Sequence, residues 1–313
     1  MLEFLLLVVG LTGLWIGANL AIKGAMNLAE HYKISHGVMG LTILALGTDL
    51  PELFIDIKAA LERLSGVETS GLVIGETIGT CFSQIGIMLG IAGLMGGIVV
   101  LKRTLNREAG IMIASVALLW LLSFDGLLSQ TDGLILIAFY VIYFLMILRE
   151  EKLKERKLFP PEIHPAQDIM AITGGLMLLA YSSNITVDNG VALSAILGVP
   201  QTVVGVLILG FGTSLPELAT TITAVRKKAG TMALGNLIGS NIFDILFTLG
   251  VGSAISGFLV DSQFHNIDIP LLIGLSVFVF ILLYTKKSLH IWESITLIAI
   301  TVGYYLAKAF IFF

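Results

Sequence analysis

Long apolar segments separated by short polar connections recur along the whole chain. A helix needs about 20 apolar residues to cross a bilayer. The sequence offers ten such segments: 2–24, 36–60, 69–97, 107–124, 131–149, 168–188, 200–225, 230–257, 267–284 and 289–312. The pattern therefore predicts an all-α membrane protein with ten transmembrane helices.

The composition indicates that lipid covers most of the surface. Of the 313 residues, 56% are apolar and 13% are charged, whereas soluble domains have about 45–50% and about 25%. A soluble enzyme, a disordered chain and a secreted disulfide scaffold are excluded, and a single cysteine, Cys81, allows no intrachain disulfide. The net charge of −4 gives no general attraction to nucleic acid. Because no basic residues precede the first apolar segment, we interpret it as a mature span and not a cleaved signal peptide.

The basic residues predict the orientation in the cell membrane. The loops after the first, third, fifth, seventh and ninth segments hold 15 of the 18 lysines and arginines. The other side holds three, Lys58, Arg63 and Lys308. Since cytoplasmic loops carry the excess of Lys and Arg, we expect the odd-numbered loops in the cytoplasm and both termini outside. The charged stretch 150–167 is expected to be a solvated cytoplasmic connector.

Two motifs occur twice. Residues 38–53 match residues 203–218 at ten of sixteen positions, and residues 75–90 match residues 235–250 at six of sixteen. This predicts two homologous halves, 1–149 and 168–313, with repeats at about 38–90 and 203–250. Each half has five predicted spans, an odd number, so the second half inserts upside down relative to the first. Inverted repeats of this kind are a recurring plan of secondary transporters.

Each repeat contains a proline followed by an acid inside an apolar segment: Pro51 and Glu52, then Pro216 and Glu217. Proline lacks an N–H and crowds the carbonyl four residues earlier, so carbonyls near the proline lose their helical partners and need a cavity or an ion. A carboxylate at this depth costs a few kcal/mol or more unless it is paired, and no Lys or Arg lies at similar depth. Carboxylates, carbonyls and hydroxyls together are the oxygen ligands that Ca²⁺ and Na⁺ prefer.

The second motif adds polar residues at helical spacing. Ser240 and Asp244 lie four residues apart, as do their repeat partners Thr80 and Gln84, so each pair shares one helix face. Small-residue pairs in the same motif predict close helix packing; these are Gly75 with Gly79, and Gly235 with Gly239.

The first half is the more acidic one. Asp49, Asp56 and Glu76 stand where the second half has Ser214, Thr221 and Asn236. We expect Asp49 to contact the site directly or through a neighbour. For Asp56 and Glu76, a ligand role and a role in a wet entrance funnel are equally open.

These motifs resemble those of the sodium/calcium exchanger family of the Ca²⁺/cation antiporter superfamily, in its compact prokaryotic form. The resemblance rests on Gly47–Leu53 (GTDLPEL), Gly212–Leu218 (GTSLPEL) and Gly235–Ile245 (GNLIGSNIFDI). It implies a functional monomer in which the first and sixth spans slide across a core of repeat helices. It also implies transported Ca²⁺ and Na⁺ and no cofactor.

The resemblance also assigns roles to residues of this chain. Glu52 and Glu217 would be the central Ca²⁺ ligands, shared with Na⁺. Thr48 and Thr213 would contribute carbonyls, with Ser214 nearby. Thr80 and Ser240 would line Na⁺ sites, and Gln84 and Asp244 the middle position. Asp49, Thr80 and Gln84 depart from the family pattern, which has Ser, Ser and Asn there. The added carboxylate of Asp49 changes the charge that the transported ions must balance, so the identity of the two exchanged ions and their stoichiometry stay open.

The leading hypothesis is a Ca²⁺/Na⁺ antiporter that works by alternating access. A Ca²⁺/H⁺ or K⁺-linked exchanger of the same superfamily is the alternative. A passive cation channel is favoured less, because the inverted repeat indicates a carrier. An intramembrane aspartyl protease is also favoured less, because no Gly-x-Gly-Asp motif occurs.

Overall fold

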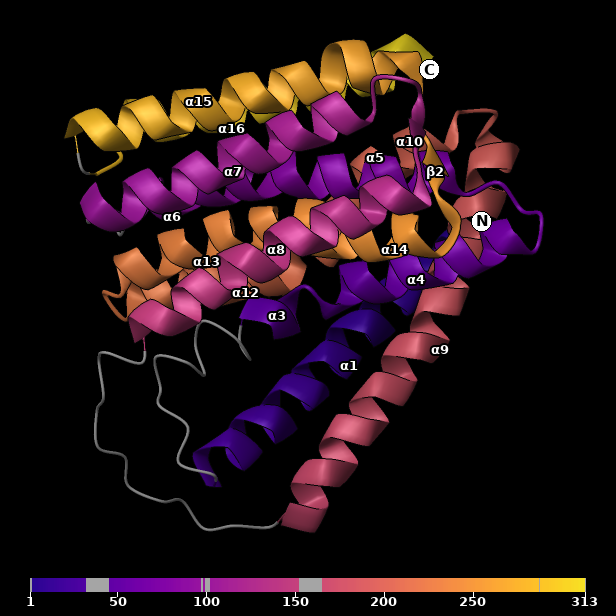
Figure 1. Ribbon diagram of the computed structural model, residues 1–313, viewed down its shortest axis with the longest axis horizontal. Coiled ribbons are helices and arrows are strands. Elements are labelled where there is room, and N and C mark those ends of the chain that lie inside the picture. Colours follow the sequence, from indigo (N-terminus) through magenta and orange to yellow (C-terminus); the bar gives the residue numbers. More distant parts are fainter. Residues whose placement is uncertain are drawn as a thin grey trace.

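The computed structural model describes residues 2–31, 45–96, 98, 102–151, 165–286 and 288–312. It is a bundle of long helices, most of them running alongside one another (Figure 1). Within the described residues, eight helical stretches are long and apolar enough to cross a membrane: Leu2–Asn27, Ser70–Leu94, Leu105–Leu122, Gln130–Arg149, Ala166–Leu197, Gln201–Arg226, Gly230–Ser256 and Phe264–Thr285. The chain is therefore an all-helical, multi-pass membrane protein.

Two of the ten predicted spans, 36–60 and 289–312, have no counterpart among these eight stretches. Part of 36–60 lies outside the described residues, and the rest forms helices α3 (Ala45–Thr48) and α4 (Leu50–Leu64). The last predicted span, 289–312, corresponds to helix α16 (Ile291–Phe312), which is not among these eight. The prediction for 168–188 was too short, because helix α9 runs over Pro165–Leu197. The helix continues through polar residues beyond the predicted end. One of them, Asn189, bonds to its own helix, because its side-chain amide donates to the carbonyl of Ile185 at 2.8 Å.

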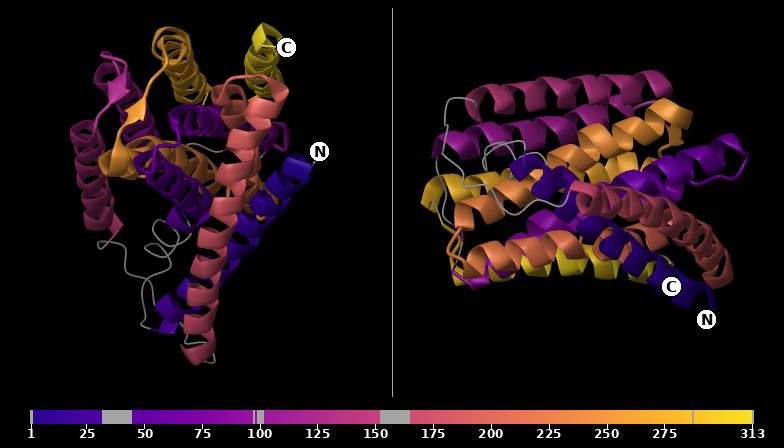
Figure 2. Two further views of the ribbon diagram at one scale, coloured as in Figure 1. Left: turned by 90° about the vertical axis from the view of Figure 1, so that its right-hand side faces the viewer. Right: turned by 90° about the horizontal axis from the view of Figure 1, so that it is seen from below.

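Helices α1 (Leu2–His31) and α9 form a tilted antiparallel pair that crosses the other helices, and they lie side by side in both views of Figure 2. Gly10 of α1 packs near Thr186, and Gly24 lies near Asp168 at the opposite end of α9. In the most apolar 18-residue stretches of these two helices, only 33% and 28% of the residues are buried. Small residues let the two backbones approach, while most of their outer surface faces away from the protein.

The centre of the bundle contains two composite helices. The first is α5 (Ser70–Phe82), η2 (Ser83–Met88) and α6 (Leu89–Leu94), and the second is α13 (Gly230–Phe243), η4 (Asp244–Thr248) and α14 (Leu249–Ser256). In the most apolar 18-residue stretches of these two composite helices, 83% and 72% of the residues are buried. Each contains a π-helical stretch at the equivalent place, around Gln84 and from Asp244 onward. Such stretches are rare and often lie at functional sites.

The predicted small-residue pairs behave differently. A Cβ atom on Gly75 or Gly79 would lie 2.6 Å and 2.5 Å from the carbonyl oxygens of Thr202 and Val206, so α5 packs closely against the helix segment that begins at Gln201. Gly235 and Gly239 have no described atom within 4 Å of the equivalent position. By the repeat, their partners would be residues 37 and 41, which lie outside the described residues.

The remaining helices surround this core: α7 (Lys102–Leu122), α8 (Gln130–Glu151), η5 (Phe264–Asp268) with α15 (Ile269–Lys286), and α16. Two short strands, β1 (Leu127–Leu128) and β2 (Phe258–Leu259), pair antiparallel and tie two loops together. The purely helical prediction omitted these strands, because two-residue segments leave no periodic signal.

Candidate ion-binding site

Each proline motif lies at a break between two helical pieces. Helix α3 ends at Thr48, and α4 begins at Leu50. In the second half, α10 (Gln201–Val204), η3 (Gly205–Leu209) and α11 (Gly210–Thr213) precede the break, and α12 (Leu215–Arg226) follows it. Proline is well tolerated in the first turn of a helix, where its missing N–H is not needed. Each helix therefore restarts one residue before its proline.

The glutamates after the prolines lie in the first turns of α4 and α12. Glu52 and Glu217 are fully buried, and no described N–H or O–H group donates a hydrogen bond within 3.5 Å to any of their four carboxylate oxygens. Asp49 lies next to Glu217, and Thr213 lies near Glu52. The partial positive charge at a helix N-terminus stabilises a nearby carboxylate by only about 0.3–2 kcal/mol. This is less than burial costs, so each side chain needs either a bound cation or a proton to neutralise it.

The residues at the breaks differ between the halves although their backbones agree. Asp49 has φ −87° and ψ 5°, and Ser214 has φ −75° and ψ 2°. The Ser214 hydroxyl donates to the Gly210 carbonyl at 2.5 Å. Asp49 is fully buried, and its carboxylate lies close to the Ser240 hydroxyl and the Glu217 carboxylate. The structure thus brings Asp49 next to the second half's glutamate.

The π-helical stretches meet at the middle of the site. The Gln84 amide donates to Asp244 Oδ2 at 3.2 Å. The Asn241 amide in turn donates to Gln84 Oε1 at 2.5 Å. Asp244 Oδ1 and the Ser240 hydroxyl are buried and unbonded among the described residues. The sequence interpretation paired Gln84 with Asp244 but missed Asn241, whose offset from Gln84 along the chain gives no sign of their contact.

A second group of oxygens surrounds Glu76. The Thr213 hydroxyl lies 3.0 Å from Glu76 Oε1, and the Thr80 hydroxyl lies 3.4 Å from the same oxygen. The two hydroxyls are 3.4 Å apart, and Thr80 also reaches the Gly210 carbonyl at 3.2 Å. Glu76 is buried with the site and does not lie in an open funnel. Asp56 is also fully buried, next to Gly252.

The charge of this region is one-sided. Six acids are buried within it: Asp49, Glu52, Asp56, Glu76, Glu217 and Asp244. Several repel one another, and Glu217 is opposed by both Asp49 and Glu52. In the part of the chain that the structure describes, none of the six forms an ion pair with a lysine or arginine. Cations or protons must therefore balance their charge.

Carboxylates alone do not form the site. Across the described ranges, no group of three or more His, Cys, Asp or Glu side chains is arranged to hold a metal ion. An ion here would also need hydroxyl, amide and carbonyl oxygens, which the broken helices and Thr80, Thr213 and Ser240 supply. This mixed oxygen set suits hard cations.

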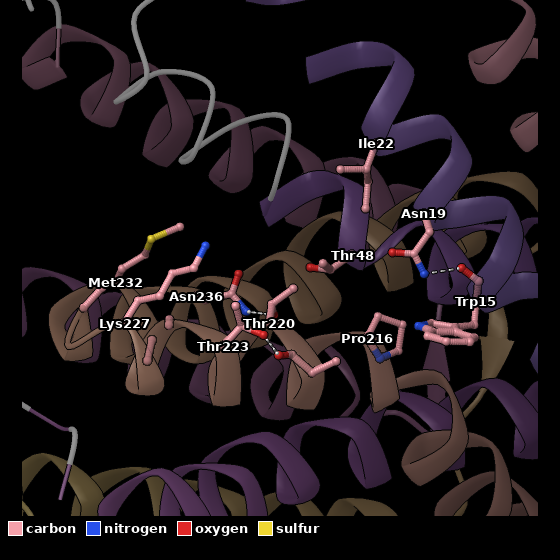
Figure 3. A pocket seen from close by; sticks show the side chains of 14 residues that line it. Trp15, Asn19, Ile22, Thr48, Pro216, Thr220, Thr223, Lys227, Met232 and Asn236 are labelled. Atoms are coloured by element: carbon pink, nitrogen blue, oxygen red, sulfur yellow. Dashed lines mark hydrogen bonds between the residues drawn. The ribbon is translucent and has the colours of Figure 1, made fainter. Parts of the chain in front are cut away.

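A cavity of about 390 Å³ leads toward the proline motifs from one end of the bundle. Its lining runs from Lys227 and Met232, which are exposed, to Thr48 and Pro216, which are buried. Figure 3 shows Asn19 of α1 and Thr48 on one side of it, opposite the side chains of α12 and α13. Among the described residues, this cavity therefore extends from the Lys227 end to Thr48 and Pro216 of the two proline motifs.

A family model described as sodium/calcium exchanger protein matches residues 2–149 and 168–310. The chain belongs to this family. The sodium/calcium exchanger MaX1 of Methanosarcina acetivorans is 26% identical over 344 residues, covering 96% of this chain and 97% of that protein. The inner membrane protein YrbG of Escherichia coli is 29% identical over 294 residues, covering 90% and 89%.

Solved structures of the sodium-calcium exchanger NCX_Mj share the fold. One, soaked with 2.5 mM Na⁺ and 0.1 mM Sr²⁺, has a TM-score of 0.68 and 27% identity, covering 98% of both chains. The predicted family resemblance and compact prokaryotic size are therefore confirmed. Membership of the sodium/calcium exchanger family makes the chain a multi-pass membrane transporter of the cation antiporter class and not an enzyme.

Proposed function

We propose that this member of the family exchanges Ca²⁺ for Na⁺ across the cell membrane, and that Glu52 and Glu217 are the central shared ligands. The observation that carries the proposal is the pair of matching helix breaks, each with a buried glutamate whose oxygens have no described hydrogen-bond partner. One Ca²⁺ or several Na⁺ would neutralise the same carboxylates. Because Ca²⁺ and Na⁺ compete for the same carboxylates, their fluxes are coupled.

The remaining ligands in this proposal are those that the sequence motifs single out. Thr48 and Thr213 contribute from the ends of α3 and α11, and Ser240, Thr80, Gln84 and Asp244 contribute from the central helices. Asp49 and Ser214 occupy the two breaks. The burial of all these residues supports the assignment.

Alternating access would use two inverted five-helix repeats, 1–149 and 168–313, joined by the connector 150–167. The antiparallel packing of α1 against α9 supports inversion, because these are the first helices of the two halves. In the proposed orientation, with odd-numbered loops in the cytoplasm and both termini outside, Lys227 lies on the cytoplasmic side. The cavity of Figure 3 is then an inward-facing path, and α1 and α9 slide as a pair, within one monomer, to close it.

Ca²⁺ uptake by proteoliposomes tests the proposal. Vesicles loaded with Na⁺ should accumulate Ca²⁺ when the outside solution is free of Na⁺, and dissipating the Na⁺ gradient should stop uptake. Uptake that follows a pH gradient and ignores Na⁺ would instead indicate a Ca²⁺/H⁺ exchanger, and a requirement for K⁺ would indicate a K⁺-linked one. Ca²⁺ flux that needs no counter-ion would indicate a channel.

A further inference from the structure

Helices α8 and α16, the last helices of the two halves, pack in matching ways. A Cβ on Gly250 would lie 3.2 Å from the Gly133 carbonyl oxygen of α8, and a Cβ on Gly90 would lie 2.8 Å from the Ser294 carbonyl oxygen of α16. Each outer helix therefore packs against one composite central helix in the same register. The buried positions of the two helices recur at an offset of 161 residues: Gly133, Leu136, Tyr140, Tyr143 and Ile147 in α8, and Ser294, Leu297, Thr301, Tyr304 and Lys308 in α16.

One polar contact departs from this match. The Tyr305 hydroxyl of α16 donates to the Gly79 carbonyl of α5 at 2.8 Å. At the same offset, α8 has Phe144, whose ring packs against Tyr140 with centroids 6.0 Å apart and which has no group to donate. Tyr305 and Phe144 are both half-buried. At this position, therefore, a hydroxyl ties α16 to the first composite helix, whereas α8 has no such bond to the second.

Neighbouring elements hold Gly79 and the turn that follows it. A Cβ on Gly79 would lie 2.5 Å from the Val206 carbonyl oxygen, so α5 packs tightly against η3 here. Tyr305 binds the Gly79 carbonyl from α16. Three residues further on, Phe82 stacks on Tyr304 with ring centroids 4.0 Å apart and planes at 15°. These contacts fix the last turn of α5 directly before the π-helical stretch η2.

The same turn carries two of the proposed ligands. Thr80 follows Gly79 directly, and Gln84 lies in η2, where its amide donates to Asp244. Because Thr80 and Gln84 belong to one continuous helix, a shift of the Gly79 peptide displaces both. Ligands of a binding site need supporting contacts that hold them to within about 0.5 Å, and the Tyr305 hydroxyl is such a contact.

A buried ion pair fixes α16 itself. Lys308 Nζ lies 2.5 Å from Asp268 Oδ2 of η5, and the two side chains are 4% and 0% exposed. Lys308 Nζ also lies over the Phe264 ring, 4.8 Å from its centroid. Separating a buried pair of this kind leaves an uncompensated charge and is strongly destabilising. Because Lys308 lies one turn beyond Tyr304 and Tyr305, the ion pair keeps both tyrosines in register with α5.

We propose that Tyr305 is a positioning residue of the ion site, which holds Thr80 and Gln84 in place through the Gly79 carbonyl. The inference rests on the proposed exchange of Ca²⁺ for Na⁺ and adds a residue from outside the repeated motifs. Glu52 and Glu217 stand on other helices, α4 and α12. Loss of the Tyr305 hydroxyl should therefore weaken Na⁺ binding, which uses Thr80 and Gln84, more than Ca²⁺ binding.

The test measures binding of radioactive Ca²⁺ to purified full-length protein and its displacement by Na⁺. In Tyr305→Phe, which removes one hydroxyl and keeps the ring, the Na⁺ concentration that displaces half of the Ca²⁺ should rise about threefold, equivalent to about 0.7 kcal/mol. The Kd for Ca²⁺ should change less, and retained Ca²⁺ binding shows that the variant is folded. Replacing Tyr305 by 4-aminophenylalanine, which keeps a hydrogen-bond donor at the same place, should restore the Na⁺ dependence.

Tyr143→Phe is the matched control, because it removes a tyrosine hydroxyl of the equivalent helix that donates to Glu108 of α7. It should lower Tm without altering the displacement by Na⁺. An unaltered Na⁺ concentration in Tyr305→Phe, an equal rise in Tyr143→Phe, or no restoration by 4-aminophenylalanine would overturn the positioning role. Failure of the exchange proposal shows differently, as Na⁺ that displaces no Ca²⁺ even from the unaltered protein, and it would remove the Tyr305 proposal with it.

Discussion

The two proline motifs have nearly the same backbone and different chemistry. Asp49 and Ser214 occupy helix breaks with dihedral angles within about 12° of each other. The Ser214 hydroxyl donates to a carbonyl of the preceding helix, whereas the Asp49 carboxylate lies next to Ser240 and Glu217. Backbone geometry thus sets where the proposed ligands lie, and side-chain identity sets how many acidic groups each half contributes. The two halves therefore keep the same backbone at the break although their side chains differ in charge.

The largest effect is expected where the halves agree. Glu52→Gln and Glu217→Gln should each reduce Ca²⁺/Na⁺ exchange at least about 100-fold, equivalent to about 2.7 kcal/mol, because each removes one central charge while keeping the side chain's shape. Initial Ca²⁺ uptake in proteoliposomes is the measurement. Exchange at the unaltered rate by either variant would remove that glutamate from the proposed site.

The second-largest effect is expected for the packing of α1 against α9, the first helices of the two halves. A Cβ on Gly175 would meet the Gly17 carbonyl at 2.6 Å and the Ala21 nitrogen at 2.7 Å. Gly175→Val should therefore force α1 and α9 apart and cost about 1–3 kcal/mol, seen as a lower Tm. Gly174→Val is the control, since no described atom lies within 4 Å of its Cβ position. Equal Tm values for the two variants would contradict the close contact.

A smaller change is expected where the halves differ. Asp49→Ser gives the first break the residue of the second and removes one negative charge beside Glu217. The Ca²⁺ concentration for half-maximal uptake should rise about tenfold, or about 1.4 kcal/mol, while exchange continues. Thr77→Ser, a buried hydroxyl variant on the neighbouring helix, provides a control for altered packing. An unchanged Ca²⁺ dependence in Asp49→Ser would place this carboxylate outside the ion path.

The sequence predicted most helix boundaries and singled out the two prolines at which the helices restart, because apolar length and proline are local signals. Two features escaped it for a physical reason. The contacts of Glu76 with Thr213 and of Asn241 with Gln84 join residues 137 and 157 positions apart, which only the packing of the two halves creates. Helix α9 exceeded its prediction because polar residues such as Asn189 bond to their own backbone and continue the helix.

The smallest effect is expected from an ion pair at one end of the bundle, whose loss should shift the balance between the two access states. At the end opposite the cavity, Lys58 of α4 forms an ion pair with Asp188 of α9 at 3.7 Å, and Asp188 is 58% exposed. By the repeat, their counterparts are Thr223, which lines the cavity, and Lys23. These two cannot form an ion pair. Breaking the first pair should therefore favour the state in which the Lys58 end opens and the Lys227 end closes.

Because an exposed ion pair contributes about 0.2–1 kcal/mol, Asp188→Asn should lower the population of the state seen here by no more than about fivefold. Thiol labelling of a Thr223→Cys background reports that state, and the buried Cys81 adds little signal. The labelling rate should fall in Asp188→Asn. Asp168→Asn is the control, because Asp168 bonds to Asn27 within the α1–α9 pair and leaves the Lys58 contact intact. A labelling rate that falls equally in both variants would mean that loss of an acid from α9, and not loss of the Lys58 ion pair, shifts the equilibrium.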